Sequence, residues 1–215
     1  FNMRMSAYKN IQFRFEGSYG RAFMVLFVWP ILGILTLGIL YPMALLKMNE
    51  YVVGNSRYGT TAFNFKATYG QYGMIFLTLL GIALVCGLPL AAISTFLPAL
   101  APLTYVLLLL MYLGMIVYFI TATTNLFYAS SSIVDNQFSA SVSMPELAKV
   151  MLINAFLVIV TLGLYLPAAK VRMTKYIASC INLEATDSLD NFVAAEKQNI
   201  SALGEEFGEV FDFGL

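Results

Sequence analysis

The sequence predicts an all-α polytopic membrane protein with about four transmembrane helices, an internal repeat, short amphipathic β-strands and interfacial helices. Of the 215 residues, 60% are hydrophobic and 11% are charged, whereas a soluble domain has roughly 25% charged residues. The 68 residues between Lys66 and Asp135 include no Lys, Arg, Asp or Glu, which is enough for two spans of about 20 residues each. The third observation is a repeated segment of twenty residues.

The repeat relates residues 36–55 (TLGILYPMALLKMNEYVVGN) to residues 161–180 (TLGLYLPAAKVRMTKYIASC) at a constant offset of 125. Both copies contain a Thr-Leu-Gly triplet, here called the TLG motif, and a proline four residues after its glycine. We predict that the glycine lets the chain leave one helix and that the proline begins the next, where its missing N–H needs no partner. The predicted structural joints are Gly38, Pro42, Gly163 and Pro167.

Apolar runs and alternating patterns place the remaining elements. The predicted spans lie near residues 22–40, 71–96, 103–126 and 148–167. Short amphipathic strands are predicted near 11–16, 61–66 and 136–142, because aromatic and polar residues alternate there. Pro30 should kink the first span. The interfacial tyrosines, expected at head-group depth where aromatic residues with a polar tip concentrate, are Tyr41, Tyr51 and Tyr176.

These elements predict a membrane domain over residues 1–183 and an acidic amphipathic tail over residues 184–215. Within the membrane domain, repeat units near 11–66 and 136–183 flank a helical hairpin at 71–126. The tail has eight acidic residues and one lysine, whereas residues 1–69 have seven basic and two acidic residues. We expect the tail to face solvent or a basic partner, with Asp187 as the N-cap of a helix.

Lys and Arg counts beside the spans predict the topology, since cytoplasmic loops carry an excess of these residues. Four crossings put seven basic residues on one side and four on the other, so both termini are cytoplasmic. The two TLG segments are then inverted relative to one another, and Arg57 and Lys175 face opposite sides. The alternative is that both basic segments after the TLG motifs face the cytoplasm, which requires one TLG run to be re-entrant.

No catalytic, cofactor-binding or metal-binding residue is predicted. Histidine is absent and the two cysteines form no CxxC pattern, which removes the usual general base and metal ligands. We therefore expect no enzyme activity and no cofactor. The remaining catalytic alternative is a Ser/Lys dyad from Ser143 or Ser179 with Lys149 or Lys170.

Polar side chains inside the apolar runs are candidates for a functional path. The candidate positions are Thr36, Asn125, Asn154 and Thr161. In the structural interpretation the threonines bond to their own helices and Asn154 bonds across a helix interface. In the functional interpretation they line a path for a polar substrate or water. The runs contain no carboxylate or histidine of the kind that a proton-driven transporter keeps inside the membrane.

Four phrases together resemble the YjgN-like family of bacterial inner-membrane proteins. They are FRFEGSYGRAF from Phe13, the TLG motif with its proline, GNSRYGTTAFNF at 54–65 and SALGEEFGEVFDF at 201–213. The family is catalogued as a domain of unknown function, so the resemblance implies a multi-pass inner-membrane location without an activity. Its members usually begin with a further strand-plus-TLG unit, so we expect this chain to be the C-terminal part. The resemblance also suggests a membrane-associated metallopeptidase as a partner.

Two function classes remain open. The first is a non-enzymatic membrane scaffold or partner-binding subunit, favoured by the lack of buried ionisable groups and by the acidic tail 184–215. The alternative is a transporter or pore that passes a small solute or lipid between the repeats, which the internal duplication suggests. We expect membrane lipids as partners and no nucleic acid.

Overall fold

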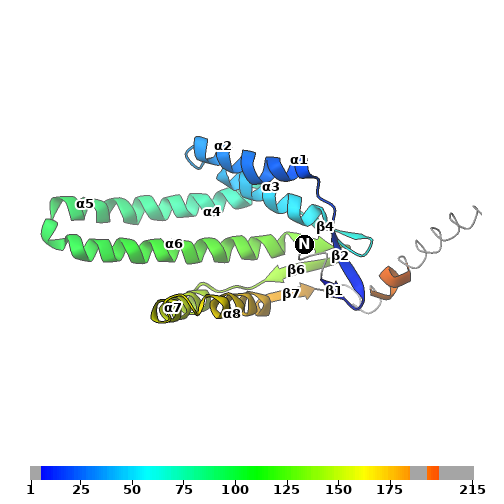
Figure 1. Ribbon diagram of the computed structural model, residues 1–215. Coiled ribbons are helices and arrows are strands. Elements are labelled where there is room, and N and C mark those ends of the chain that lie inside the picture. The colour runs from blue at the N-terminus through cyan, green and yellow to red at the C-terminus, as the bar shows by residue number, and fades with distance from the viewer. Residues whose placement is uncertain (1–5, 185–192, 199–215) are drawn as a thin grey trace, which may run out of the picture. The chain divides into compact units, whose positions relative to one another are not determined.

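The computed structural model describes residues 6–184 and 193–198. After a short first strand, β1 (Ala7–Tyr8), its elements follow the same order three times: a strand, a helical hairpin and a returning strand (Figure 1). The chain is therefore built from three copies of one unit, of which the second has the longest hairpin.

The first unit leaves β2 (Ile11–Phe15) and returns at β3 (Ser56–Tyr58). Its outward arm is α1 (Tyr19–Phe23), the π-helical η1 (Met24–Val28) and α2 (Trp29–Leu35), and its return arm is α3 (Tyr41–Gly54). The π-helical segment ends just before Pro30, the residue predicted to kink this helix. A π-bulge upstream of a proline absorbs the hydrogen bond that the proline cannot donate.

The second unit leaves β4 (Thr61–Phe65) and returns at β5 (Ser131–Ile133). Its arms are α4 (Tyr69–Ile82), η2 (Ala83–Gly87) and α5 (Leu88–Phe96) outward, the 3-10 turn η3 (Pro98–Leu100), and α6 (Ala101–Ala129) on the return. The π-helical η2 again lies directly before a proline-containing turn, at Pro89. Figure 1 shows the two arms side by side along their length.

The third unit leaves β6 (Asn136–Ala140), forms α7 (Met144–Val160) and α8 (Leu166–Ser179), and returns at β7 (Ile181–Glu184). Its boundaries repeat those of the first unit at the same offset of 125. The first strand, the end of the outward arm, the whole return helix and the start of the second strand all coincide. The duplication seen over twenty residues therefore extends over a complete unit.

Each outward arm begins three residues after its strand at a hydroxyl residue in extended conformation, namely Ser18, Thr68 or Ser143. Thr68 forms a full capping box with Gln71, and the Ser143 hydroxyl accepts the N–H of Glu146 at 3.4 Å. Such caps satisfy N–H groups that the first helical turn leaves free. The sequence therefore marks each strand-to-helix transition locally.

The described strands form one antiparallel sheet in the order β1-β2-β3-β4-β5-β6-β7. Two-residue turns join β1 to β2, β3 to β4 and β5 to β6. Positive φ angles occur in all three turns, at Lys9 and Asn10 (48° and 69°), Gly59 (61°) and Val134 (52°). Positive φ matches the twist of a tight hairpin, but it strains a β-branched residue such as Val134.

One backbone hydrogen bond closes every unit at its base. In each case the N–H just after the outgoing strand donates to a carbonyl just after the return helix. The bonds run from Glu16 to Asn55 (2.9 Å), from Lys66 to Ser130 (2.8 Å) and from Ser141 to Cys180 (3.0 Å). The two ends of each helical hairpin are therefore hydrogen-bonded to one another.

The described residues divide into two compact units, each with its own core. One lies within Phe1–Lys66, Ser130–Phe138 and Leu183–Leu215, and the other within Ala67–Ala129 and Ser139–Asn182. The first core gathers Ile11, Tyr58, Ile133 and Val193 on the sheet. The second gathers Val117, Val142 and Leu147, with partly buried residues of α8 packed against them.

The predicted all-α class with about four transmembrane helices is wrong, because of the seven-stranded sheet and because fewer helices can span. Among the described residues two helices are long and apolar enough to cross a membrane, Tyr69–Phe96 (28 residues) and Pro98–Ala129 (32 residues). Only 6% and 11% of their most apolar windows are buried within the protein, so these side chains face outward rather than into a core.

The other two predicted spans, near 22–40 and 148–167, end early. Their helices stop at Leu35 and Val160, and the chain turns back into α3 and α8. Strand pairing at the base accompanies this return, and the predicted inverted arrangement of the two TLG segments stays a prediction. The three predicted strands are confirmed as β2, β4 and β6. Asp187 and most of the predicted tail lie outside the described residues.

Candidate partner-binding site

The candidate site is a carboxylate held at the turn between β3 and β4. The strands pair Tyr58 with Thr61, which leaves Gly59 and Thr60 as the two turn residues. Gly59 has φ +61°, a conformation that glycine adopts without steric cost. The turn thereby presents the N–H of Thr60 and the hydroxyls of Thr60 and Thr61 toward one point.

Glu196, in the helical residues 193–198, lies at that point and is only 2% exposed. Its Oε1 accepts hydrogen bonds from the Thr60 N–H and, at 2.7 Å, from the Thr60 hydroxyl. Its Oε2 accepts the Thr61 hydroxyl at 2.7 Å. Both carboxylate oxygens are thus satisfied by neutral donors, an arrangement that strengthens in a desolvated site.

The electrostatics of Glu196 favour the ionised form. Burial raises the pKa of this carboxyl, but the hydrogen bonds from Thr60 and Thr61 outweigh burial and hold the pKa below its ordinary value of 4.5. Within the described ranges no lysine or arginine forms an ion pair with it. The turn therefore binds the carboxylate by hydrogen bonding rather than by charge pairing.

An apolar contact one helical turn away completes the site. Val193 is 5% exposed and packs with Ile11, Tyr58 and Ile133. The Tyr58 hydroxyl donates to the Tyr8 carbonyl at 3.1 Å, and burial, with smaller effects of Tyr8 and Glu196, raises the pKa of Tyr58. Residues 193–198 are thus held by one apolar anchor and one charged anchor, three positions apart.

The sheet beneath this contact carries a row of phenylalanines from equivalent positions of the three units. Phe13 and Phe63 have ring centroids 6.4 Å apart, and Phe63 and Phe138 are 6.2 Å apart. Phe13 also contacts Tyr58 at 5.1 Å. Aromatic pairs at these distances add stability beyond their buried area, so the repeat itself builds the platform.

Gly59 is required at the site for a second reason. A Cβ atom placed there would lie 2.3 Å from Oε1 of Glu196 and 3.0 Å from its Cδ. Any larger residue would therefore displace the carboxylate as well as strain the backbone.

The predicted structural joints occupy two closely similar turns. Gly38 and Gly163 have φ +92° and +93°, and the preceding leucines, Leu37 and Leu162, are also left-handed. Pro42 and Pro167 lie in the first turn of α3 and α8. In each copy a helix ends before the TLG threonine and the next begins at the residue before the proline.

The tyrosines expected at the interface make specific contacts within the protein. The Tyr51 hydroxyl donates to the Ser18 carbonyl at 3.0 Å, and the Tyr176 hydroxyl donates to the Ser143 carbonyl at 3.2 Å. Both bonds tie a return helix to the start of its outward arm. Tyr41 lies against Gly33, where an added Cβ would come within 2.9 Å of its ring.

The candidate polar positions are engaged within the protein. Thr36 and Thr161 donate to carbonyls of their own helices, Leu32 at 2.8 Å and Leu157 at 2.7 Å. The Asn125 amide bonds both backbone groups of Val142, at 2.9 and 3.0 Å. Asn154 donates from α7 to the Ala169 carbonyl of α8 at 3.2 Å.

The residues of the alternative Ser/Lys dyad are not brought together as a nucleophile and base. Ser143 caps α7, Ser179 donates to the Tyr176 carbonyl at 2.7 Å, and Lys149 pairs with Glu146 at 2.7 Å. In the described part of the chain no group of three or more Cys, Asp or Glu residues is arranged to hold a metal ion.

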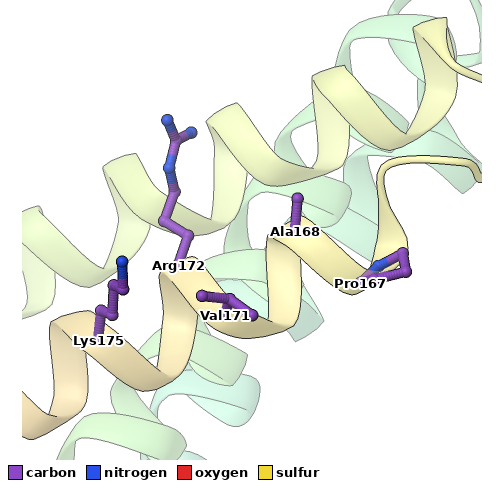
Figure 2. Close-up of a pocket in the computed structure, with 5 residues that line it drawn as sticks. All are labelled: Pro167, Ala168, Val171, Arg172 and Lys175. Atoms are coloured by element: carbon purple, nitrogen blue, oxygen red, sulfur yellow. The ribbon is translucent and has the colours of Figure 1, made fainter.

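A basic surface lies on α8 beside an open hollow of about 520 Å³. Figure 2 shows its lining side chains on successive turns, with Arg172 and Lys175 extending away from the helix in the same direction. Lys170, Arg172 and Lys175 form no ion pair with any described residue, whereas Lys47 of the first unit pairs with Glu50 at 2.8 Å. The third unit therefore presents unneutralised positive charge.

Neither Glu196 nor the turn that binds it is predicted from the sequence, in which Glu196 is one of the tail acids expected to face solvent or a basic partner. Two signals point to the site. Val193 and Glu196 are three residues apart, hence on one helix face, and Gly-Thr-Thr at 59–61 falls between two short strand-like segments.

Comparison with known proteins identifies the family of this chain. The model of a family described as bacterial protein of unknown function (DUF898) matches residues 1–210, in agreement with the resemblance drawn from the motifs. No curated protein matches, and no solved structure matches.

Proposed function

The chain belongs to the DUF898 family of bacterial proteins of unknown function, and we propose that it is a non-enzymatic inner-membrane scaffold that binds a partner protein through its C-terminal tail. The observation that carries the proposal is the docking of residues 193–198 on the sheet through Val193 and Glu196. A docked segment of this kind fixes the position of residue 198, which residues 199–215 follow in the sequence.

The charge of those following residues indicates the partner's chemistry. Residues 199–215 contain four acidic and no basic residues, with three phenylalanines among them. Such a tail suits a basic surface with apolar pockets on a partner protein. A membrane-associated metallopeptidase remains one such candidate.

The α4–α6 hairpin supports a membrane anchor, because its two helices exceed the length of about 20 residues that a crossing needs. All twelve Lys and Arg residues lie outside 67–134, so the positive-inside rule places both ends of this hairpin in the cytoplasm. β1 and residues 193–198 both pack on the same part of the sheet. Both ends of the chain are therefore proposed to be cytoplasmic.

The engagement of the polar positions within the protein favours a scaffold over a solute path. One observation favours the alternative, a passage for a small solute or lipid: Thr121 Oγ1 and Asn154 Oδ1 are buried without a hydrogen-bond partner among the described residues. A buried hydroxyl or amide oxygen without a partner needs one such as water or a solute.

Photo-crosslinking in intact membranes tests the scaffold. A photoreactive amino acid at Phe211 of the full chain should give a discrete adduct that Glu196→Ala weakens and Lys197→Ala, an exposed neighbour, leaves intact. Solute flux in vesicles that rises with protein content, together with no specific adduct, would overturn the scaffold in favour of the passage.

A further inference from the structure

We propose that the two hairpins that carry TLG motifs, residues 19–54 and 144–179, are re-entrant elements that insert into one leaflet of the bilayer and return to the side they entered. The inference rests on the membrane anchor proposed above. It is carried by four observations: closure at the base, arm length, the hydrogen bonding of the tip, and the position of charge.

Closure at the base excludes a single crossing by either hairpin. β2 and β3 pair Phe13 with Tyr58, and Glu16 donates to the Asn55 carbonyl at 2.9 Å. The third unit is closed by the bond from Ser141 to Cys180 at 3.0 Å. Because the two ends of each hairpin are bonded to one another, the chain must leave on the side where it enters.

The arms of both hairpins are shorter than the hydrocarbon core is thick. The outward arms have 17 residues and the return arms 14, which are about 26 and 21 Å long at 1.5 Å per residue. The hydrocarbon core is about 30 Å thick. The arms of the α4–α6 hairpin, with 28 and 32 residues, reach about 42 and 48 Å.

The charge-free part of each arm is shorter than a full crossing. In the first hairpin it comprises residues 22–35 and 41–46, and in the third 150–160 and 166–169. These segments are about 21 and 9 Å long in the first hairpin and about 17 and 6 Å long in the third, against about 15 Å for half of the hydrocarbon core. The charge-free part of each outward arm is therefore long enough for one leaflet, and that of each return arm is shorter.

The tip of each hairpin can enter hydrocarbon because its backbone donors are satisfied. Lipid offers no hydrogen-bond partner, so non-helical backbone is costly there unless it is paired internally. From Thr36 to Tyr41 six successive N–H groups are bonded, and Pro42 has none. The same six bonds recur from Thr161 to Leu166, before Pro167.

The TLG threonine has a specific role in this turn. Its hydroxyl donates to the helix behind it and accepts the N–H four residues ahead, from Leu40 at 3.2 Å in the first copy and Tyr165 at 3.0 Å in the second. The side chains at the tip are apolar and point outward, with Leu37 96% and Leu162 94% exposed. The repeated motif is thus a turn built for an apolar surrounding.

The basic residues of α8 fall where this insertion would place lipid head groups. Lys170 and Lys175 lie 7 and 12 residues beyond Gly163, about 10 and 18 Å along the helix. Their long side chains can reach the phosphates from this depth. The unneutralised charge on α8 therefore faces an anionic surface rather than hydrocarbon.

The test uses the full chain with Cys86 and Cys180 replaced by alanine and one cysteine added at a time. Leu37→Cys and Leu162→Cys report the tips, Leu97→Cys the turn of the crossing hairpin, and Val134→Cys the sheet. A membrane-impermeant maleimide is applied to right-side-out and inverted membrane vesicles. Bimane attached to each cysteine is then challenged with doxyl lipids in phosphatidylethanolamine–phosphatidylglycerol vesicles.

We expect the two tip cysteines to resist maleimide from both sides and to be quenched by doxyl lipids several-fold more strongly than Val134→Cys. Labelling of the tips from the Leu97 side would show a full crossing. Labelling from the Val134 side without lipid quenching would show no insertion, and protection without quenching would show cover by protein. Each of these results would overturn the inference.

A separate result would refute the proposed membrane anchor: labelling of Leu97→Cys from the same side as Val134→Cys.

Thr161→Val, with Thr161→Ser as its matched control, tests the turn that contains the TLG motif. We expect the valine variant, which leaves the Tyr165 N–H without its acceptor, to lose lipid quenching at Leu162→Cys while the serine variant keeps it. Equal quenching in both variants would refute the role of the hydroxyl.

Discussion

Replacement of Glu196 by alanine should release residues 193–198 from the sheet. The change removes the acceptor of three hydrogen bonds, from the Thr60 N–H, the Thr60 hydroxyl and the Thr61 hydroxyl. It leaves Val193 as the remaining anchor. Because the carboxylate is buried and its donors are neutral, the loss falls on hydrogen bonding rather than on an ion pair.

The expected magnitude follows from the number and type of these bonds. A hydrogen bond to a charged group contributes about 1.5–3 kcal/mol, and bonds to one group are not additive. The donors regain water when the segment leaves, so we expect the docking free energy to fall by about 2–4 kcal/mol. Glu196→Gln keeps one acceptor but loses the charge, and should cost about 1 kcal/mol.

Hydrogen exchange of residues 56–65 measures this loss, because the Thr60 amide is protected only while it donates its hydrogen bond to Glu196. At 1.4 kcal/mol per factor of ten, Glu196→Ala should accelerate its exchange by roughly 30-fold to 1000-fold. Lys197→Ala, at an exposed neighbouring position, should leave the rate unchanged. Unchanged exchange in Glu196→Ala, or equal acceleration in both variants, would refute the assignment.

Three further predictions concern the same fold. Docking lowers the pKa of Glu196 below 4.5, so the contribution of its carboxylate to docking is complete above about pH 4.5 and is lost as the pH falls through the docked-state pKa. A spin label on Lys197→Cys should therefore gain mobility over that pH range, whereas the same label in the Glu196→Gln variant should not. Gly163→Ala should lower the thermal midpoint in detergent, because alanine at this positive φ is strained by about 1–2 kcal/mol. Gly114→Ala, with open space around it, should leave the midpoint unchanged. A larger loss in Gly114→Ala than in Gly163→Ala would contradict the role of Gly163 as a structural joint. Val134→Gly should raise the free energy of unfolding by about 1 kcal/mol, since it relieves a left-handed β-branched residue that is 53% exposed; an unchanged midpoint would show that this turn carries no strain.

The sequence predicts the repeated parts of the fold because their signals are local. The offset of 125 places the breaks after Leu35 and Val160 and the prolines that begin α3 and α8. Alternation of phenylalanine with polar residues predicts β2 and β4. These features depend on backbone preferences and side-chain period, which neighbouring residues determine.

The returning strands cannot be predicted in the same way. β3 and β5 have three residues each, Ser-Arg-Tyr and Ser-Ser-Ile, too short to show a period. They are strands because β2 and β4 pair with them at sequence separations of 41 and 66, as in Phe15 with Ser56 and Phe65 with Ser131. Without these pairs, an uncharged run such as 22–46 has the same composition whether it crosses a membrane or turns back.

The candidate site is non-local for a similar reason. Glu196 contacts Thr60 and Thr61 across about 135 positions, and the acidity of the tail does not by itself indicate which acid is buried. The periodicity of the tail predicts that Val193 lies on an apolar face. Which surface that face covers is decided by the sheet, whose phenylalanine row comes from three separate units.

The sidedness of Arg57→Cys and Lys175→Cys tests most directly whether both TLG hairpins return to the side they leave. Each cysteine, in the chain without native cysteines, is exposed to an impermeant maleimide in right-side-out and in inverted membrane vesicles. We predict that both positions are labelled in the same vesicle orientation, because the bonds from Glu16 to Asn55 and from Ser141 to Cys180 close each hairpin at its base. Labelling of the two positions in opposite orientations would contradict this closure and restore an inverted pair of spans.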